Sequence, residues 1–469
     1  MRGLTSTIIL VVILSGLGSY IYFVDSKKPA AGAGSDTPKA KVFAIDTEKI
    51  TDLTLTYQGE TSVLKKAAAG WTMVEPSATD ADAAEAMSLA QALSNIESSR
   101  TIDENPATLA EYGLEKPTVT IAFKGEGNVS GSLSLGDKTA MQGDMYAIKG
   151  GDKKVFLVPA FQESTFTKKP FDLRDRKLLK FDREKADTLV MSRAGEDLEM
   201  ARTGSDWRVV KPGPARGDYS SVEGLITRLS TSNMATLVEP DAKDLAKYGL
   251  DKPSMTITVG AGSAKSALQV GKTENNLTYA RDASRPLVFT IDTTLQGDTK
   301  KSFGDYRRKE FFEFRPFSVT RIRAVLDAPG GPKIYEFEKA KAAKASDPDL
   351  WKVAKQGGES HEVKSSSMDD LLGRLSDLKA QSYADAKTKT GLDKPALVIS
   401  VSYDEGKFER VRFGEVGETA FALRDGESGA GKIEKLSLEG ALLALDTAVM
   451  PPPPAPAAPP AQGAAGDKK

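Results

Sequence analysis

The 469-residue sequence contains no cysteine and only one histidine. Without cysteine, the chain can form no disulfide, no thiolate metal site and no cysteine nucleophile, although this leaves the cellular compartment open. Because His361 is the sole histidine, a zinc site built on several histidines is excluded, and a serine–histidine–aspartate triad could use no other base. His361 lies in the polar stretch GGESHEVKSSS, where we expect an exposed turn without a catalytic role.

The sequence also lacks a charge excess. It has 64 basic and 65 acidic residues and a formal net charge of -1, so no overall field attracts nucleic acid or an anionic membrane surface. Basic residues are not interleaved with aromatic residues as in nucleic-acid-binding chains. No spacing of carboxylates singles out an acid–base pair. We therefore expect no catalytic residue, no cofactor, no metal and no nucleic acid.

The longest stretch without charge lies near the N-terminus. Residues 4–24, LTSTIILVVILSGLGSYIYFV, are about as long as the roughly 20 residues that cross a bilayer as a helix. We expect an uncleaved membrane anchor behind a three-residue head, residues 1–3. The alternative is a signal peptide cleaved near the small residues around Ser19. The lysines that follow the span do not fit the positive-inside rule, but a short head with a large trailing body favours an exported body.

Low-complexity segments bound the rest of the chain. Residues 25–43 form a Pro/Ala/Gly-rich tether after the anchor, and residues 450–469 contain the stretch PPPPAPAAPPAQGAAGDKK. Such a tail cannot bury a core, so we expect it to be solvated, with a polyproline ligand for a partner domain as the alternative. The folded part therefore lies between these two segments.

Within the folded part, four landmark residues recur in the same order. The three tryptophans of the sequence each precede a glycine by 42, 42 and 40 residues. Such matched gaps indicate three tandem repeats of domain size, which we place at residues 44–170, 171–314 and 315–449. The landmarks are Trp71, Gly113, Pro117 and Gly136; Trp207, Gly249, Pro253 and Gly271; and Trp351, Gly391, Pro395 and Gly414.

Each repeat combines strands with one helix. Alternating apolar residues and glycine turns open each repeat and predict a β-hairpin. An amphipathic helix follows, at residues 82–98, 220–232 and 365–380. Further strands come after it, and the turns between them are too short for helical crossovers. The sequence thus predicts an α+β fold, with one N-terminal transmembrane helix followed by three mostly antiparallel repeats.

The glycine landmarks belong to a repeated motif, written EYGLEKP, KYGLDKP and TGLDKP. We predict a short helix that starts with Asn105 as cap and Pro106 at its first position. Gly113 then ends this helix in the left-handed conformation, and Pro117 directs the chain into a strand. The functional alternative treats the acid–lysine pairs of the motif as ligand contacts. The third copy has Thr390 in place of the tyrosine, which a shared ligand contact would not easily tolerate.

Two basic, aromatic-flanked segments join the repeats: FDLRDRKLLKF at 171–181 and FGDYRRKEFFEF at 303–314. We expect them to dock one repeat on the next. The alternative is a patch for an anionic partner, formed by Arg174, Arg176, Arg307 and Arg308.

One segment imitates a nucleotide-binding motif. GESGAGK at 426–432 matches the phosphate-loop pattern, but Ile433 stands where the magnesium-binding serine or threonine is needed. Alignment of the repeats places the segment in a hairpin turn, whereas a phosphate loop joins a strand to a helix. We therefore expect no nucleotide binding.

These motifs together resemble a known family. The repeated YGL-acid-KP, the preceding W-x-V, the following LG-x-KT and the LRDRKLL junction resemble the bacterial domain of unknown function 4340, over about residues 41–445. The third copy departs from the pattern: it has Phe413-Gly414-Glu415 at the LG-x-K turn and lacks a clear final strand, so we expect a degenerate capping copy. The resemblance implies a bacterial envelope protein, often encoded beside gliding-motility-type ABC transporter components, and no known reaction or ligand.

Two classes of function remain from the sequence. The first is a non-enzymatic scaffold, anchored in the inner membrane by residues 4–24 with its body in the periplasm. Its protein partner would belong to an envelope complex, such as an ABC transporter permease. The second is an extracytoplasmic solute- or glycan-binding protein with a pocket between repeats; a hydrolase is a more distant third. Deep pockets with convergent polar groups favour the second class, and exposed apolar patches favour the first.

Overall fold

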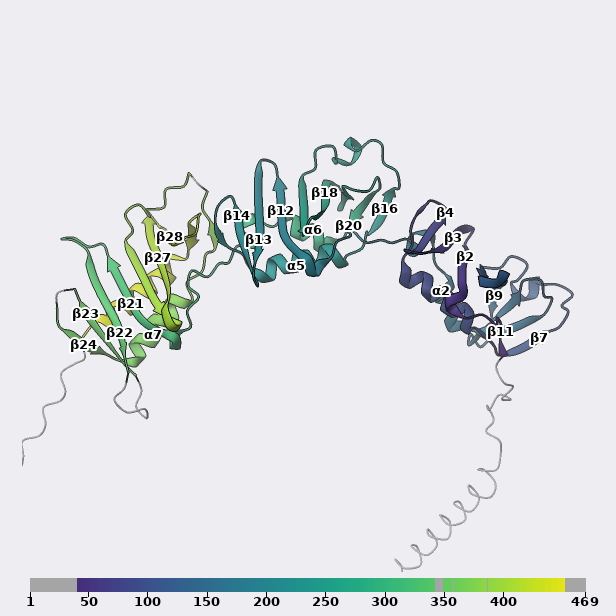
Figure 1. Cartoon of the computed structure of the whole chain (residues 1–469), viewed down its shortest axis with the longest axis horizontal. Coiled ribbons are helices and arrows are strands. Elements are labelled where there is room, and N and C mark those ends of the chain that lie inside the picture. The colour runs from purple at the N-terminus through teal and green to yellow at the C-terminus, as the bar shows by residue number, and fades with distance from the viewer. Residues whose placement is uncertain (1–39, 342–348, 357, 386, 452–469) are drawn as a thin grey trace, which may run out of the picture. The chain divides into compact units, whose positions relative to one another are not determined.

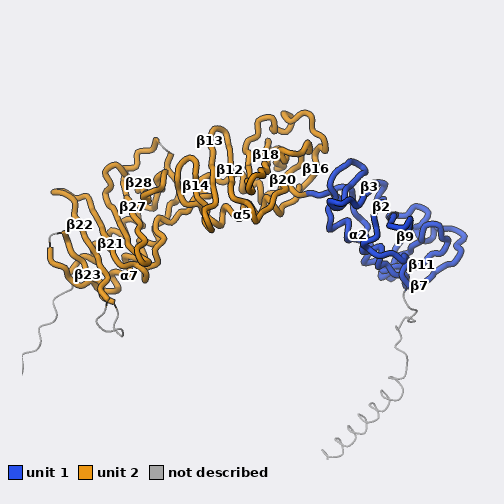
Figure 2. The backbone as a smooth tube through the Cα atoms, viewed as in Figure 1, with its two compact units in different colours: residues 1–176 blue, residues 177–469 orange. Residues whose placement is uncertain are grey.

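The computed structural model of the chain describes residues 40–341, 349–356, 358–385 and 387–451 (Figure 1). The expected anchor, nearly all of the tether and all but the first two residues of the tail lie outside these residues. No helix among the described residues is long and apolar enough to span a membrane. The chain divides into two compact bodies, residues 1–176 and 177–469 (Figure 2). The first body contains the first repeat, and the second contains the other two.

Each repeat forms one nine-stranded sheet, and the three sheets share one strand order. All the strand pairs within the described residues are antiparallel, so the predicted antiparallel α+β fold is confirmed. In each sheet, the first four strands of the repeat form one meander, and four later strands form a second meander. The two meanders join where their first strands pair, as β2 pairs with β8 in the first repeat. The strand that follows the main helix pairs with the last strand of the second meander and forms that edge of the sheet.

In sheet order, the first sheet contains β5 (Thr79–Asp80), β4 (Gly70–Glu75), β3 (Glu60–Ala67), β2 (Ile50–Tyr57), β8 (Val119–Gly125), β9 (Ser130–Lys138), β10 (Asp144–Lys149), β11 (Val155–Pro159) and β7 (Arg100–Asp103). The second contains β15 (Ala215–Arg216), β14 (Asp206–Lys211), β13 (Glu196–Thr203), β12 (Ala186–Arg193), β17 (Met255–Ala261), β18 (Ala264–Glu274), β19 (Leu277–Asp282), β20 (Val288–Ile291) and β16 (Thr236–Glu239). The third contains β24 (Ser360–Val363), β23 (Leu350–Lys355), β22 (Lys333–Ala340), β21 (Val319–Leu326), β26 (Leu397–Tyr403), β27 (Lys407–Val416), β28 (Thr419–Arg424), β29 (Gly431–Ile433) and β25 (Ser382–Tyr383). A separate two-stranded sheet pairs β1 (Ala40–Lys41) with β6 (Glu97–Ser98).

One main helix covers a face of each sheet: α2 (Ala83–Asn95), α5 (Tyr219–Thr231) and α7 (Ser365–Ser376) (Figure 1). Asp82 and Asp218 cap the first two helices, because their carboxylates accept hydrogen bonds from backbone N–H groups of the first turn. The apolar stripe of each helix is buried against the sheet, and each buried leucine contributes about 1.5–3 kcal/mol. Leu89 and Leu93, Leu225 and Leu229, and Leu371 and Leu375 are examples.

In the first two repeats, the last strand along the chain, β11 or β20, leads into shorter helices. The first repeat has η5 (Ala160–Gln162), α3 (Glu163–Phe166) and α4 (Pro170–Leu173), and the second has α6 (Thr293–Lys300) and η8 (Phe303–Tyr306). In the third repeat, one longer helix, α8 (Lys435–Val449), packs against α7. The strand that the sequence was expected to lack is present there as β29, which pairs with β28 and β25. The third repeat thus retains the full topology, although β29 has only three residues.

The prediction of a helix that starts at Asn105 is wrong. Only a single 3₁₀ turn forms, η3 (Ala110–Tyr112), with η7 (Ala246–Tyr248) as its counterpart in the second repeat. The side chains of Asp103 and Thr108 accept hydrogen bonds from the backbone N–H groups of Asn105 and Ala110. Such local bonds stabilise turns at the expense of helix, so Asp103 and Thr108 stabilise two successive turns here.

Candidate functional site at the junction of the second and third repeats

The two repeated glycines of each repeat face each other across one close contact. Gly113, Gly249 and Gly391 have φ angles of 67°, 67° and 70°. In the first two repeats the turn is of the Schellman type, because Leu114 and Leu250 donate to the carbonyl five residues back. A Cβ at Gly136, Gly271 or Gly414 would lie 2.1, 2.2 or 2.4 Å from the carbonyl oxygen of the residue before that turn glycine. The later glycine is thus required so that its strand can pass under the turn.

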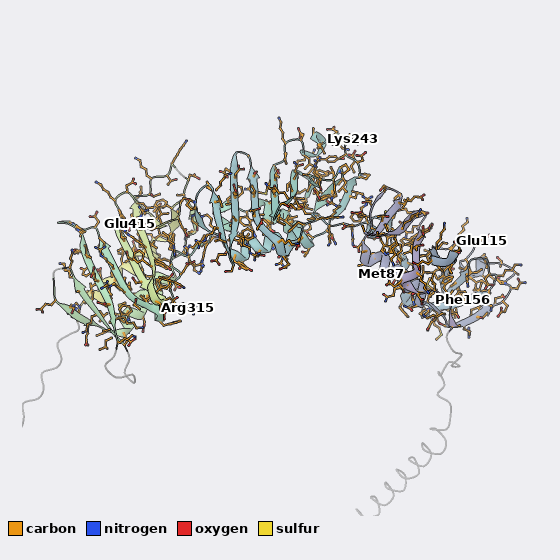
Figure 3. The ribbon with its side chains drawn as sticks, viewed as in Figure 1. Met87, Glu115, Phe156, Lys243, Arg315 and Glu415 are labelled. Carbon is orange, nitrogen blue, oxygen red and sulfur yellow. The ribbon has the colours of Figure 1, made fainter. Side chains whose placement is uncertain are left out.

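The other motif residues also have architectural positions. Each proline landmark stands two residues before a strand: Pro117 before β8, Pro253 before β17 and Pro395 before β26. The acid–lysine pairs of the motif are exposed, as Figure 3 shows for Glu115. The three tryptophans are each the second residue of an equivalent strand, β4, β14 or β23, and all are buried.

The tyrosine of the motif packs on a second tyrosine in the first two repeats. The ring centroids of Tyr112 and Tyr146, and of Tyr248 and Tyr279, are 5.1 Å apart. The Tyr248 hydroxyl donates to Glu239 at 2.6 Å, and this bond together with burial raises the pKa of Tyr248. In the third repeat Phe421 takes the place of the second tyrosine and packs with Leu392 instead. The departure at Thr390 is therefore matched by a change in its packing partner.

The basic junction segments have equivalent contacts. In the first repeat, Asp82 N–H donates to the carbonyl of Leu173, and Asp175 N–H donates to that of Asp80. In the second, Asp218 N–H donates to Tyr306 and Arg308 N–H to Arg216. These bonds identify Arg307 as the counterpart of Arg174, and Arg308 as that of Asp175. The two segments recur because each forms the same backbone hydrogen bonds with its own repeat.

The four candidate arginines make different contacts. Arg174 is buried and donates to the Ser77 hydroxyl at 2.7 Å, whereas Arg176 lies over the Phe171 ring and 4.0 Å from an Asp172 carboxylate oxygen. In the second body, Arg307 stacks on Tyr383 of the third repeat at 3.7 Å from the ring centroid.

The fourth, Arg308, belongs to an ion-pair network that joins the second and third repeats. Its Nη1 donates to Glu313 at 2.7 Å. Arg216, at the edge strand β15 of the second repeat, donates through Nε to Glu427 of the third repeat at 2.5 Å. Arg424 lies 3.3 Å from the fully buried Glu409, which also accepts from the backbone N–H of Glu313.

The network is electrostatically matched. Burial alone would raise the pKa of Glu313, but the nearby guanidinium groups of Arg216, Arg424 and Arg308 outweigh it and lower that pKa. Breaking one buried pair leaves an uncompensated charge, which typically costs about 3–5 kcal/mol. Docking of one repeat on the next requires contacts of this kind between the second and third repeats, and Arg307 and Arg308 take part in them. The sequence does not single out Arg216, Glu409, Arg424 and Glu427, because their pairing joins residues up to 211 positions apart.

The GESGAGK segment, which matches the phosphate-loop pattern in sequence, belongs to the same junction. Residues 426–430 form the turn between β28 and β29, and a strand rather than a helix follows. Ser428 N–H donates to the Pro214 carbonyl at 2.7 Å, and the Ser428 carbonyl accepts from Arg307 at 2.7 Å. The segment thus has the turn that the alignment of repeats predicts, and the carbonyls of Ser428 and Gly429 contact the second repeat by accepting from Arg307.

A polar cavity of about 390 Å³ opens beside this network. Its walls are the start of β14, the stretch from β15 to the first residue of α5, and the junction segment. Arg216, Arg308 and Glu313 of the network line it, together with the exposed Asp206, Arg208 and Tyr219.

Exposed apolar side chains gather at one equivalent turn of the first and third repeats. In the first repeat they are Met141, 94% exposed, and Phe161, 77% exposed; Ala160 N–H donates to Gly143, which holds their two turns together. The strand registers make Leu436 of α8 and Thr294 of α6 the counterparts of Phe161. Leu436 is 73% exposed. The second repeat has Asn275 and Asn276 at its turn, followed by Leu277, which is 46% exposed, so it lacks only the apolar side chain at the position of Phe161.

His361 lies in strand β24 and is half-buried, so the exposed turn expected there is wrong. No group of three or more histidine, cysteine, aspartate or glutamate side chains that could hold a metal occurs among the described residues.

Comparison with known proteins gives one family. A sequence model described as a domain of unknown function, DUF4340, matches residues 71–208 and 207–395. Each match begins at a landmark tryptophan, and the first ends just past the next, so it spans one repeat period. No curated protein matches the chain significantly. A crystal structure of the DNA polymerase sliding clamp from Pseudomonas aeruginosa is similar over 84% of this chain and 93% of that chain, at 10% identity and a TM-score of 0.13. So low a score carries no argument.

Proposed function

Because the chain belongs to the DUF4340 family of tandem repeats, whose description assigns no activity, we propose that it is a non-enzymatic scaffold of the bacterial envelope. Residues 4–24 anchor it in the inner membrane, and the repeats lie in the periplasm. Its partner is a membrane protein of an envelope complex such as an ABC transporter. The observation that carries this proposal is the exposed apolar side chain at one equivalent position of the first and third repeats, Phe161 and Leu436.

The comparison among repeats supports a role in binding for these turns. The three repeats share their fold, so a fold requirement would place similar residues at all three turns. Instead, Phe161 and Leu436 are exposed where Thr294 stands in the second repeat. A large exposed apolar side chain costs solubility unless a partner covers it, and aromatic and methionine side chains are favoured at such interfaces. The first and third repeats are therefore the proposed points of contact.

Site-specific photo-crosslinking in native membranes tests the contact. A photoreactive amino acid at Phe161 or at Leu436 should form an adduct with one integral membrane protein, and the same probe at Thr294 should form none. Adducts at Thr294 of the same identity and yield, or no adduct at either apolar position, would show that these turns do not bind a partner.

Membrane fractionation with N-terminal sequencing tests the anchor separately. We expect the mature protein to retain residues 4–24 and to sediment with the inner membrane, because the span has no charge to interrupt it. A soluble mature protein that begins near Ser19 or later would contradict the anchor.

A further inference from the structure

The outer edge of β24 differs from the matching edges of the first two repeats, because no described residue pairs with it. β24 is the edge strand of the third sheet (Figure 1), and its last residue, Val363, pairs with Trp351. Glu362 and Lys364, on either side of Val363, are exposed. Apart from the pairing with β23, the Glu362 carbonyl and the Lys364 N–H form no backbone hydrogen bond within the described part of the chain.

The junction segments cover the equivalent edges of the other two repeats. Gly217 holds the position of Val363, because both lie opposite the landmark tryptophan. Gly217 forms an antiparallel bridge with Arg307, and the carbonyl before Gly217 and the N–H after it bind the junction segment. Ala81 and its two neighbours do the same in the first repeat. Their counterparts in the third repeat are the carbonyl and the N–H described above, which therefore point away from the sheet.

The first repeat has the other half of such a junction. Where a junction segment enters the second repeat, Leu178 N–H donates to the carbonyl of Ser232, the C-cap of α5. At the entry to the first repeat, Val42 N–H donates in the same way to Ile96, the C-cap of α2. No described repeat precedes this entry. The array of described repeats thus has a half-junction at each end, the edge of β24 and the entry strand β1.

The sequence before Val42 matches the open edge in charge. In the two junction segments, the residue whose N–H binds the edge carbonyl stands three residues before the entry donor, as Asp175 stands before Leu178. Lys39, which lies outside the described residues, stands three residues before Val42. It would therefore lie opposite Glu362. Opposite charges at directly facing positions stabilise an antiparallel strand pair.

The proline beside Lys39 is also compatible with this pairing. Pro38 takes the position of Arg307 in the junction segment. The edge does not use the Arg307 N–H, which donates to Gly304 of its own segment instead. A residue without an N–H group therefore fits at this position of an edge strand.

We propose that the outer edge of β24 binds the entry segment of a second copy of this chain, residues 37–42, so that copies associate head to tail. The contact reproduces the junction between the second and third repeats, with Glu362 of one copy opposite Lys39 of the next. An edge strand with unpaired backbone groups favours such pairing with another chain. The interface is heterologous, so it extends to longer assemblies unless a ring closes. The proposal is independent of the membrane partner, because the apolar turns take no part in it.

Disulfide crosslinking in native membranes tests the proposal, since the sequence contains no cysteine that could interfere. Two differently tagged full-length copies, one with Lys39→Cys and the other with Glu362→Cys, are coexpressed and oxidised. Facing residues of an antiparallel pair have Cα atoms about 4.5–5.5 Å apart, which lies within the range of about 4.4–6.8 Å for disulfides. We expect a mixed disulfide dimer. A chain with both substitutions should give a ladder of oligomers that a reductant removes.

Asp197→Cys in place of Glu362→Cys is the matched control, since Asp197 is an exposed acid on β13 of the second repeat. It should give no mixed dimer. In the absence of cysteine, Glu362→Lys and Lys39→Glu should each weaken self-association of the purified protein about fivefold in analytical ultracentrifugation, because each places like charges opposite each other. The two changes together should restore the association. Unfolding of Glu362→Lys, followed through Trp351 fluorescence, should match the wild type.

The proposal is overturned if the mixed dimer does not form, or if it forms equally well with Asp197→Cys. It is also overturned if two Glu362→Cys chains crosslink more readily than the mixed pair, since that would indicate pairing of two β24 edges. A double variant that crosslinks only within one chain would overturn it as well.

Discussion

Replacing Gly271 by alanine tests the close contact under the YGL turn. The added methyl would lie 2.2 Å from the Tyr248 carbonyl oxygen and 3.0 Å from Leu250 Cγ. A backbone oxygen cannot rotate away as a flexible side chain can, so the turn itself must shift. Overpacking of this kind costs about 1–3 kcal/mol. With a denaturant slope of roughly 2 kcal/mol per molar urea, the midpoint should fall by about 1 M.

The assay can report the second repeat alone, because each repeat has one buried tryptophan. Trp71→Phe together with Trp351→Phe leaves Trp207 as the only indole. Its fluorescence then follows unfolding of the second repeat in urea. The same Gly271→Ala change, followed through Trp71 in the complementary variant, should leave the midpoint of the first repeat unchanged.

Gly297→Ala provides a control with the opposite sign in the same repeat. Gly297 lies in α6, and a Cβ there would have no neighbour within 4 Å. Alanine should raise the stability of the second repeat by up to about 1 kcal/mol, since it favours helix. The neutral pair Asp251→Asn and Lys252→Gln should change stability by less than about 0.5 kcal/mol. If Gly271→Ala shifts the midpoint no more than this pair does, the contact is not the reason for the glycine.

Three further outcomes follow from the contacts. Glu223→Met should lower the stability of the second repeat by about 1–3 kcal/mol, measured in urea through Trp207, because Trp207 Nε1 loses its acceptor at 2.9 Å; Glu223→Gln, which keeps an acceptor, should cost less. The lowered pKa of Glu313 means that its ion pairs stabilise the fold above its ordinary value of 4.5 and lose this contribution as pH falls below it; stability of Glu313→Gln should therefore fall less on acidification. Magnesium–ATP should leave the unfolding temperature unchanged, in the wild type and in Lys432→Gln alike, because GESGAGK turns between two strands; a shift confined to the wild type would contradict this.

The repeat and its antiparallel sheets could be predicted because their signals are local or periodic. Gly249 stands between a short helical turn and a strand, where only glycine adopts the left-handed conformation without strain. The matched gaps between landmarks reveal the period directly. The short helix at Asn105 could not be predicted correctly, since whether Asp103 and Thr108 bind nearby backbone depends on a competition between turn and helix that patterns do not resolve.

The junction was predictable only in part. Arg307 and Arg308 stand out because their segment recurs, but the partners of this segment are far away in the chain. Arg216 and Glu427, for example, are 211 residues apart. Neither residue has a neighbour in the sequence that marks it as half of a buried ion pair. The cavity likewise arises from three separate segments, so no single motif could announce it.

The backbone of the junction segment is hydrogen-bonded to both the second and the third repeat. Arg308 N–H donates to Arg216 of the second repeat, while Lys309 accepts from Ala380 and Phe311 N–H donates to Leu378 of the third. Within four residues, the backbone therefore changes from hydrogen bonds with the second repeat to hydrogen bonds with the third. A force that stretches the chain would therefore act directly on these hydrogen bonds. It would be transmitted from one sheet to the next without first extending a flexible linker.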